Sequence, residues 1–163
     1  MHGVTPLEDA QAFVLESCPP LPVVEVARRE ALGLVLAAPV IAGEIVPPFD
    51  NTAVDGYAVR SVDVADAPVE LLVVGEIAAG AAPDREVGPG EAVRIMTGAP
   101  MPDGADAVVM VEDSERVGDD RVLLTRAVDA GAALRRAGDD VRIGDRIFDE
   151  GTVVRPSVEA VLA

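Results

Sequence analysis

The sequence has few of the side chains that most enzymes use for nucleophilic catalysis or transition-metal binding. Its 163 residues include one Cys, one His, one Tyr, three Phe and no Trp, and all 13 of its basic residues are Arg. A single cysteine, Cys18, excludes an internal disulfide and a zinc site built from cysteines. We expect the only histidine, His2, to lie in a frayed terminus, which argues against Ser-His-Asp and Cys-His catalysis within this chain. Carboxylates, hydroxyls, arginine and the backbone remain as the groups that could carry chemistry.

Acidic residues outnumber basic residues by 29 to 13, so the formal net charge is -16. Such a charge repels a phosphate backbone and argues against nucleic-acid binding. The longest uncharged apolar run, residues 31–43, contains Pro39 and is shorter than the roughly 20 residues that span a bilayer. Neither a basic amphipathic helix nor a signal sequence is recognisable. We therefore expect a cytoplasmic protein that binds neither nucleic acid nor membranes.

Local patterns predict a helix near each end of the chain. Thr5 is expected as the N-cap of the first helix, with Pro6 at its first position and Glu8 completing a capping box. The Pro-Pro pair at 19–20 ends that helix. A second helix is expected over 156–163, and no C-cap signal follows it. This missing signal leads us to expect that the chain is the N-terminal piece of a longer protein.

A high content of valine, 28 residues, predicts strands in the middle of the chain, because β-branched side chains suit pleated surfaces. The expected strands are 69–74, 92–96, 107–111 and 121–125, with the last two forming a hairpin around residues 118–120. A further strand pair is expected within 143–154, with its turn at 149–151.

Three segments contain residues that could carry chemistry. The first, PPFDNTAVDGYAVR, covers residues 47–60 and places Asp50, Asn51 and Asp55 within six positions. Their oxygen atoms could hold a hard cation such as Mg²⁺. The alternative is an ordinary turn, since Asp, Asn and Gly are the usual turn formers. Spacing alone favours the turn.

The second segment, RIMTGAPMPDGADAVVMVED, covers residues 94–113. Thr97 and Gly98 follow a predicted strand, where they could offer a hydroxyl group and an open backbone N–H to an anion. The alternative is a proline-rich loop with no ligand. The residues by themselves leave both interpretations open.

The third segment, LRRAGDDVRIGDRI, covers residues 134–147. Four arginines stand within twelve positions of this acidic chain and could form a local phosphate-binding patch; they are Arg135, Arg136, Arg142 and Arg146. The neighbouring acids Asp139 and Asp140 could place a metal ion against a phosphorylated ligand. The alternative is a charged loop in which these acids and arginines neutralise one another.

Taken together, the three segments resemble the N-terminal region of the molybdopterin molybdenumtransferases, the MoeA and gephyrin E-domain family. That family has segments of the types PxFDNSAMDGYA, RIMTGAPxPxGADAVVxxE and RxxGEDxxxG. This chain has, in the same order, PPFDNTAVDGYA, RIMTGAPMPDGADAVVMVE and RRAGDDVRIG. The departures are small: Thr52 replaces the usual Ser, Val54 replaces Met and Asp139 replaces Glu.

The resemblance implies an activity and a set of site residues. Enzymes of the family insert molybdate into adenylylated molybdopterin with Mg²⁺ and release AMP, in molybdenum cofactor biosynthesis. By the resemblance, Asp55, Thr97 and Asp140 are catalytic, and Asp55 and Asp140 help to hold the metal. The substrate-binding residues that it implies are Asp50, Asn51, Gly56, Tyr57, Gly98, Arg135 and Arg136.

The resemblance also implies an α+β fold with two domains. An elongated domain would comprise residues 1–45 and 137–163, and a β-rich domain, residues 46–136, would be inserted between them. The pterin-binding α/β/α domain and the C-terminal β-barrel of the family are absent from the 163 residues. The family's active cleft lies between this region of one subunit and the α/β/α domain of its dimer partner, so we expect half a site and no activity from this chain alone.

The expected partners are a second subunit, in a homodimer, and a molybdopterin adenylyltransferase that supplies the adenylylated molybdopterin. An alternative function is a non-catalytic dimerisation or scaffold module with the same fold.

Overall fold

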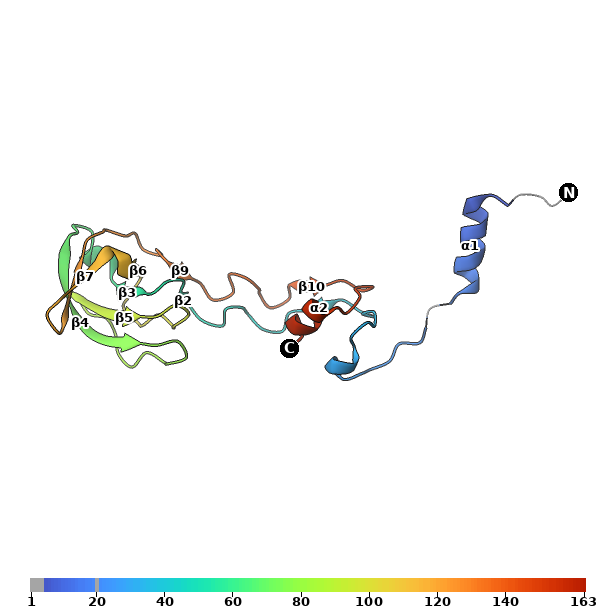
Figure 1. Ribbon diagram of the computed structural model, residues 1–163, viewed down its shortest axis with the longest axis horizontal. Helices are drawn as coiled ribbons and strands as arrows, with labels where there is room; N and C mark the ends of the chain where they lie inside the picture. Colours follow the sequence, from blue (N-terminus) through green and yellow to red (C-terminus); the bar gives the residue numbers. More distant parts are fainter. Residues whose placement is uncertain (1–4, 20) are drawn as a thin grey trace. The chain divides into compact units, whose positions relative to one another are not determined.

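The computed structural model describes residues 5–19 and 21–163 and confirms the expected α+β fold (Figure 1). The chain divides into two compact units: Met1–Val40 with Ile147–Ala163, and Ile41–Arg146. The predicted domain limits, residues 1–45 with 137–163 around 46–136, stay a prediction. None of the helices found in residues 5–19 and 21–163 is long and apolar enough to cross a membrane.

The first helix, α1 (Leu7–Ser17), begins one residue later than a capping box would require. Its N-cap is Pro6, whose ψ of 147° is extended, and no side chain bonds to the first amides. Thr5 therefore lies outside the helix, and the predicted capping box is wrong. The expected terminating residue Pro20 lies outside the described residues. Every residue of α1 is exposed, including the apolar residues Leu7, Ala10, Phe13 and Val14.

The rest of the first unit consists of short elements: the 3-10 helix η1 (Arg28–Glu30) and the helix α2 (Pro156–Val161). Pro156 occupies the first turn of α2, where a missing N–H is harmless. The predicted strand pair within 143–154 is wrong. Residues 33–36 lie beside 152–154 instead, with Leu36 N donating to Thr152 O. The strand that does form, β10 (Arg146–Phe148), pairs with β1 (Val40–Ile41).

The second unit contains a six-stranded sheet in the order β6-β3-β5-β4-β8-β7. Neighbouring strands are antiparallel except β4 and β5, which are parallel. The pairing register of β4 with β5 shifts between Val73 and Gly75. The strands are β3 (Gly56–Val59), β4 (Val69–Ile77), β5 (Glu91–Ile95), β6 (Ala107–Met110), β7 (Ser114–Val117) and β8 (Arg121–Leu124).

The hairpin around residues 118–120 has different strands from the predicted pair. It joins β7 to β8, whereas β6 pairs with β3. The 3-10 turn η3 (Val111–Asp113) separates β6 from β7. The strand β7 was not expected because its sequence, Ser-Glu-Arg-Val, is mostly polar. Such a sequence suits its position at the edge of the sheet.

The sheet is buried on both faces, which explains the long apolar stretches of β4 and β6. Alternate residues of each strand point to opposite faces. One face is built around Tyr57, Val59, Val64, Leu71, Ala92, Ala107, Val109, Val122 and Leu124. The other is built around Ala58, Ile77, Val87, Val93, Ile95, Ala99 and Val108. Segments without regular structure cover both faces: Val128 and Ala132 pack on the first, and Met101 and Ala133 pack on the second.

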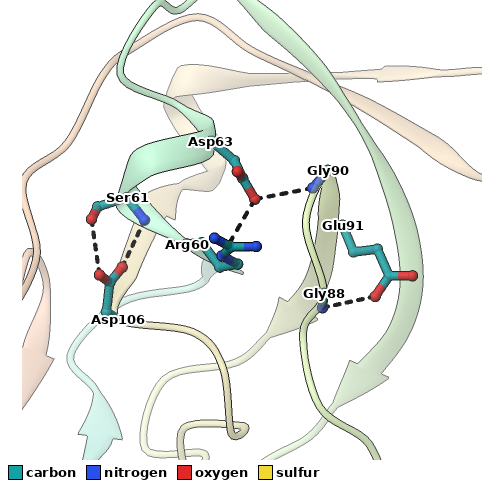
Figure 2. Close-up of polar contacts among 7 residues, drawn as sticks. All are labelled: Arg60, Ser61, Asp63, Gly88, Gly90, Glu91 and Asp106. Carbon is teal, nitrogen blue, oxygen red and sulfur yellow. Dashed lines mark hydrogen bonds and ion pairs between the residues drawn. The ribbon is translucent and has the colours of Figure 1, made fainter.

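Polar contacts hold the 3-10 turn η2 (Ser61–Asp63) against the rest of the second unit (Figure 2). The carboxylate of Asp106 accepts hydrogen bonds from the backbone N and the Oγ of Ser61, at 2.6 and 2.9 Å. At the other end of the turn, Asp63 accepts a hydrogen bond from Gly90 N at 3.0 Å. Asp106 thereby satisfies the first backbone amide of the turn, and Asp63 joins the turn to the loop that precedes β5.

Candidate functional site

A short strand, β2 (Asn51–Thr52), brings the three sequence segments together. On one side β2 pairs with β9 (Leu134–Arg135), so that Asn51 lies opposite Arg135. On the other side Asn51 forms a bridge with Pro100. Thr52 N donates to Ala99 O, and Gly98 N donates to Thr52 O. The three segments therefore meet within the second unit, although the sequence places them far apart.

Asp55 and Thr97 form the most direct contact between two predicted catalytic residues. Oδ1 of Asp55 accepts hydrogen bonds from both the backbone N and the Oγ1 of Thr97, each at 2.7 Å. The Thr97 N–H and then the Thr97 hydroxyl hold the pKa of the Asp55 carboxyl below its ordinary value, with a smaller contribution from the charge of Arg94. Asp55 is therefore a carboxylate at neutral pH, and it is exposed to solvent.

The predicted open N–H at Thr97–Gly98 is not present. Thr97 N bonds to Asp55, and Gly98 N bonds to the backbone oxygen of Thr52. The chain turns sharply here, and Gly98 has a φ of +81°, a value that favours glycine. Both amides are hydrogen-bonded within the protein, so an anion would have to bind to side chains here rather than to these backbone N–H groups.

Arg94 is a charged residue near this site that the sequence analysis did not select. Its NH1 donates to the Oη of Tyr57 at 3.3 Å, and its Cζ lies 5.7 Å from the centroid of the Tyr57 ring. Tyr57 is buried at 1% exposure, so this bond satisfies its hydroxyl group. The sequence did contain a sign of its role, because Arg94 is the one charged residue in the otherwise apolar predicted strand 92–96.

The third segment joins the site through ion pairs. Arg136 NH1 donates to Oδ2 of Asp50 at 2.6 Å, and Ala137 N donates to Oδ1 of Asp50 at 2.8 Å. Arg135 pairs with Asp140. For Arg135 the structure shows the alternative noted above, in which the acids and arginines of the loop neutralise one another, whereas Arg136 pairs with an acid of the first segment. The Ala137 amide and the Arg136 guanidinium hold the pKa of the Asp50 carboxyl below its ordinary value.

Burial divides the predicted site residues into two groups. The exposed group comprises Asp55, Thr97, Gly98, Arg135, Arg136 and Asp140, with Asp50 half-buried. Asn51, Gly56 and Tyr57 are buried. A Cβ on Gly56 would lie 2.2 Å from the backbone oxygen of Val109, so glycine is required there for strand packing. The substrate-binding roles predicted for these residues stay predictions.

The exposed residues do not line an enclosed cavity. A pocket of about 340 Å³ in the second unit lies between η2 and residues 127–130, and none of the predicted site residues lines it. Asp55, Thr97, Arg135 and Asp140 instead lie on open surface. An open surface of this kind suits a site that another surface completes.

The two predicted metal-binding acids provide too few donors for a magnesium site by themselves. In the part of the chain that the structure describes, no cluster of three or more His, Cys, Asp or Glu side chains is placed to hold a metal ion. Asp140 is paired with Arg135, whereas both hydrogen bonds to Asp55 end on Oδ1. Mg²⁺ commonly binds one or two carboxylates together with substrate phosphates. These residues therefore fit Mg²⁺ only as part of its ligand set.

Comparison with known proteins relates the whole described chain to one family. Residues 5–163 match the family described as MoeA N-terminal region (domain I and II). A molybdopterin molybdenumtransferase from Bacillus subtilis (strain 168) is 39% identical over 173 residues, covering 92% of this chain and 40% of the relative. Molybdopterin molybdenumtransferase 2 from Mycobacterium tuberculosis (strain ATCC 25618 / H37Rv) is also 39% identical, covering 100% of this chain and 40% of the relative.

A solved structure gives the same answer for the fold. The molybdopterin biosynthesis MoeA protein from Pyrococcus horikoshii OT3 superposes with a TM-score of 0.80 at 40% sequence identity, covering 84% of this chain and 37% of that protein. The 163 residues thus span about 40% of the length of the curated relatives named above. On the match of residues 5–163 and the similarity of both sequence and structure, the chain belongs to the family of MoeA N-terminal regions, domains I and II.

Proposed function

We propose that the chain is the N-terminal part of a molybdopterin molybdenumtransferase, which inserts molybdate into adenylylated molybdopterin and releases AMP in molybdenum cofactor biosynthesis. The observation that carries the proposal is the meeting of the three family segments at β2, with Asp55 held by Thr97 and Arg135 paired with Asp140. The relatives described above are molybdopterin molybdenumtransferases, which supports the transferase activity in this proposal.

The acidic and the basic side chains of the exposed site have different roles in this proposal. Asp55 stays ionised at neutral pH, and Thr97 orients it by binding Oδ1, which leaves Oδ2 to bind a ligand. The guanidinium groups of Arg135 and Arg136 bind the phosphates and molybdate. These anions must compete with Asp140 for Arg135 and with Asp50 for Arg136. When bound by Asp55, Asp140 and the substrate's own phosphates, Mg²⁺ supplies neutralisation of the anionic reactants.

The site on this chain is half of an inter-subunit site in our proposal. Its acids and arginines lie on open surface, which leaves room for a pterin-binding domain of a second subunit. We propose a homodimer of the full-length protein, located in the cytoplasm and supplied with adenylylated molybdopterin by a molybdopterin adenylyltransferase.

The test uses the full-length protein, purified and supplied with adenylylated molybdopterin, molybdate and Mg²⁺. Asp55→Ala and Asp140→Ala are each expected to abolish molybdenum cofactor formation and AMP release while leaving the thermal unfolding temperature near that of the wild type. Asp113→Asn is the control, because it removes the charged partner of Arg126 elsewhere in the second unit. Wild-type rates in both site variants would contradict the proposed roles.

The same experiment separates the enzyme from a non-catalytic module. A full-length wild-type protein that binds adenylylated molybdopterin but forms no cofactor and releases no AMP would favour the dimerisation or scaffold function instead. Formation of both products would exclude that alternative.

A further inference from the structure

Asp50 contacts both of the other family segments. Its backbone oxygen accepts a hydrogen bond from Met101 N at 3.0 Å, in the second segment. Its carboxylate accepts hydrogen bonds from Ala137 N at 2.8 Å and from Arg136 NH1 at 2.6 Å, in the third segment. The residue itself belongs to the first segment. Asp50 therefore connects all three segments. The partners of its side chain, Arg136 and Ala137, lie 86 and 87 positions further along the chain.

The carboxylate of Asp50 binds to a tight turn formed by residues 136–139. Asp139 N donates to Arg136 O at 3.1 Å, and Arg136 N donates to Oδ2 of Asp139 at 2.7 Å. Gly138 allows the turn because it has a φ of +75°, and its N–H donates to Pro47 O at 2.9 Å. Each of the four amides in this turn is hydrogen-bonded. Two of them, at 137 and 138, are held by residues 47–50.

The turn carries a predicted site residue on each side. Arg135 precedes it in β9, and Asp140 follows it, with Asp140 N donating to Val46 O at 2.9 Å. The side chains of Arg135 and Asp140 pair across the turn. Any shift of the turn would therefore change the place of both groups at once.

Both carboxylate oxygens of Asp50 are engaged by donors of the protein itself. One of these donors is a guanidinium group, and such charge-assisted bonds are stronger and better oriented than neutral ones. A carboxylate held at two points is suited to fixing a loop, whereas a substrate-binding carboxylate needs an oxygen directed at the substrate. The expectation from family resemblance, that Asp50 binds substrate, is not what these contacts favour.

We propose that Asp50 is a positioning residue that fixes the 136–139 turn and thereby sets the places of Arg135 and Asp140. The consequence for catalysis rests on the proposed function; the consequence for the turn does not. Asp50 acts through Arg136 and the Ala137 amide, which occupy both of its carboxylate oxygens.

The experiment compares Asp50→Asn, Asp50→Ala, Arg136→Gln and the double variant Asp50→Asn/Arg136→Gln in the full-length protein. Asparagine keeps an acceptor for Ala137 N but loses the charge that pairs with Arg136, whereas alanine removes both contacts. Asp113→Asn is the control for loss of another Asp–Arg pair in the same unit, the pair of Asp113 with Arg126. Thermal unfolding of each variant shows whether the whole fold is retained.

The first measurement is amide hydrogen exchange of residues 136–139, which needs no activity. Loss of a hydrogen bond to a charged group is expected to raise exchange of these amides by roughly tenfold in Asp50→Ala and by less in Asp50→Asn. The control is expected to leave their exchange unchanged. Unchanged exchange in Asp50→Ala would overturn the proposal whatever the protein catalyses.

The second measurement is the rate of molybdenum cofactor formation. Misplacement of a catalytic constellation by about 1 Å can lower a rate by roughly 100-fold, so kcat is expected to fall by about 10- to 100-fold in Asp50→Asn, because Asp140 moves with the turn. Because Asp50 acts through Arg136, the double variant is expected to be about as slow as the slower single variant. A wild-type kcat, or fully additive losses, would show that Asp50 does not act on Asp140 through the turn and would overturn the proposal. If the wild-type protein forms no cofactor, only the proposed function is refuted. Hydrogen exchange would still show whether Asp50 fixes the 136–139 turn.

Discussion

The acids of the candidate site are held by the protein before any ligand arrives. Asp55 receives two hydrogen bonds from Thr97, and Asp50 receives one from Ala137 and one from Arg136. The resemblance of the sequence to the family identified Asp55, Thr97 and Asp50 as site residues. It did not predict the hydrogen bonds that these residues make. Spacing along the chain carries no information about contacts between residues 42 or more positions apart.

The Thr97 hydroxyl is expected to matter because it orients Asp55. Thr97→Val removes the Oγ1 hydrogen bond and keeps the backbone bond, whereas Thr97→Ser keeps both. A single hydrogen bond to a charged group is worth about 1.5 kcal/mol, so the valine variant is expected to lower kcat for cofactor formation by roughly tenfold, and the serine variant to remain near wild type. Equal rates in the two variants would show that the hydroxyl has no role in orienting Asp55.

The charge of Asp50 predicts a pH dependence of stability. Its folded pKa is lowered from 3.8, chiefly by the Ala137 amide and next by Arg136. A lowered folded pKa means that the carboxylate stabilises the protein above the unfolded pKa, and that this stabilisation is lost as pH falls from about 3.8 through the folded pKa. Asp50→Asn is therefore expected to be less stable than wild type at neutral pH, with a difference that shrinks below about pH 4.

The expected difference is small because the Asp50 side chain is 38% exposed. Solvent screening limits it to about 0.5–1 kcal/mol at neutral pH. Denaturant unfolding of the two proteins at a series of pH values measures it. A difference that stays constant down to about pH 2.5 would show that Asp50 stabilises the fold through contacts that do not depend on its charge.

At the scale of elements, the sheet depends on a glycine within β3. The backbone of β6 approaches Gly56 so closely that a Cβ would lie 2.2 Å from Val109 O and 2.9 Å from Cγ1 of Val108. Gly56→Ala must push β3 and β6 apart, so it is expected to lower the free energy of unfolding by about 3 kcal/mol. Denaturant unfolding provides the measurement.

Gly43→Ala is the matched control, because nothing lies within 4 Å of a Cβ at that position. It is expected to change the free energy of unfolding by less than about 0.5 kcal/mol. If both alanine variants are equally stable, the close approach of β6 does not explain the glycine at position 56.

The strands could be predicted better than their pairing. Runs of valine and leucine predicted parts of β4, β5, β6 and β8, because β-branched and apolar residues favour a buried pleated surface. The predicted hairpin nevertheless joined the wrong strands, since β7 consists of Ser114, Glu115, Arg116 and Val117. A polar strand at a sheet edge has no apolar pattern to reveal it.

At the scale of the whole molecule, we propose that the chain provides one side of an inter-subunit site. The three family segments meet within the unit Ile41–Arg146, and their charged residues lie on open surface. The 163 residues also span about 40% of the length of the curated relatives. Both facts agree with a site that needs a further domain.

The chain of 163 residues by itself is therefore expected to form no molybdenum cofactor. A coupled assay with adenylylated molybdopterin, molybdate and Mg²⁺ measures cofactor formation, and the full-length protein serves as the positive control. Turnover by the 163 residues alone would contradict the proposal that they provide only half of a site.

The sequence by itself determined the family, the α+β class and the segments that contain the candidate residues, because these depend on local patterns and on residue identity. It also argued against Ser-His-Asp and Cys-His catalysis within this chain, because the chain has a single cysteine and a single histidine, His2, close to its N-terminus. Only the tertiary structure decided that β2 joins the three segments, that Thr97 binds Asp55, and that Asp50 holds the 136–139 turn. These contacts join residues far apart in the chain, and they form because burial of both sheet faces folds the connecting segments back onto the strands.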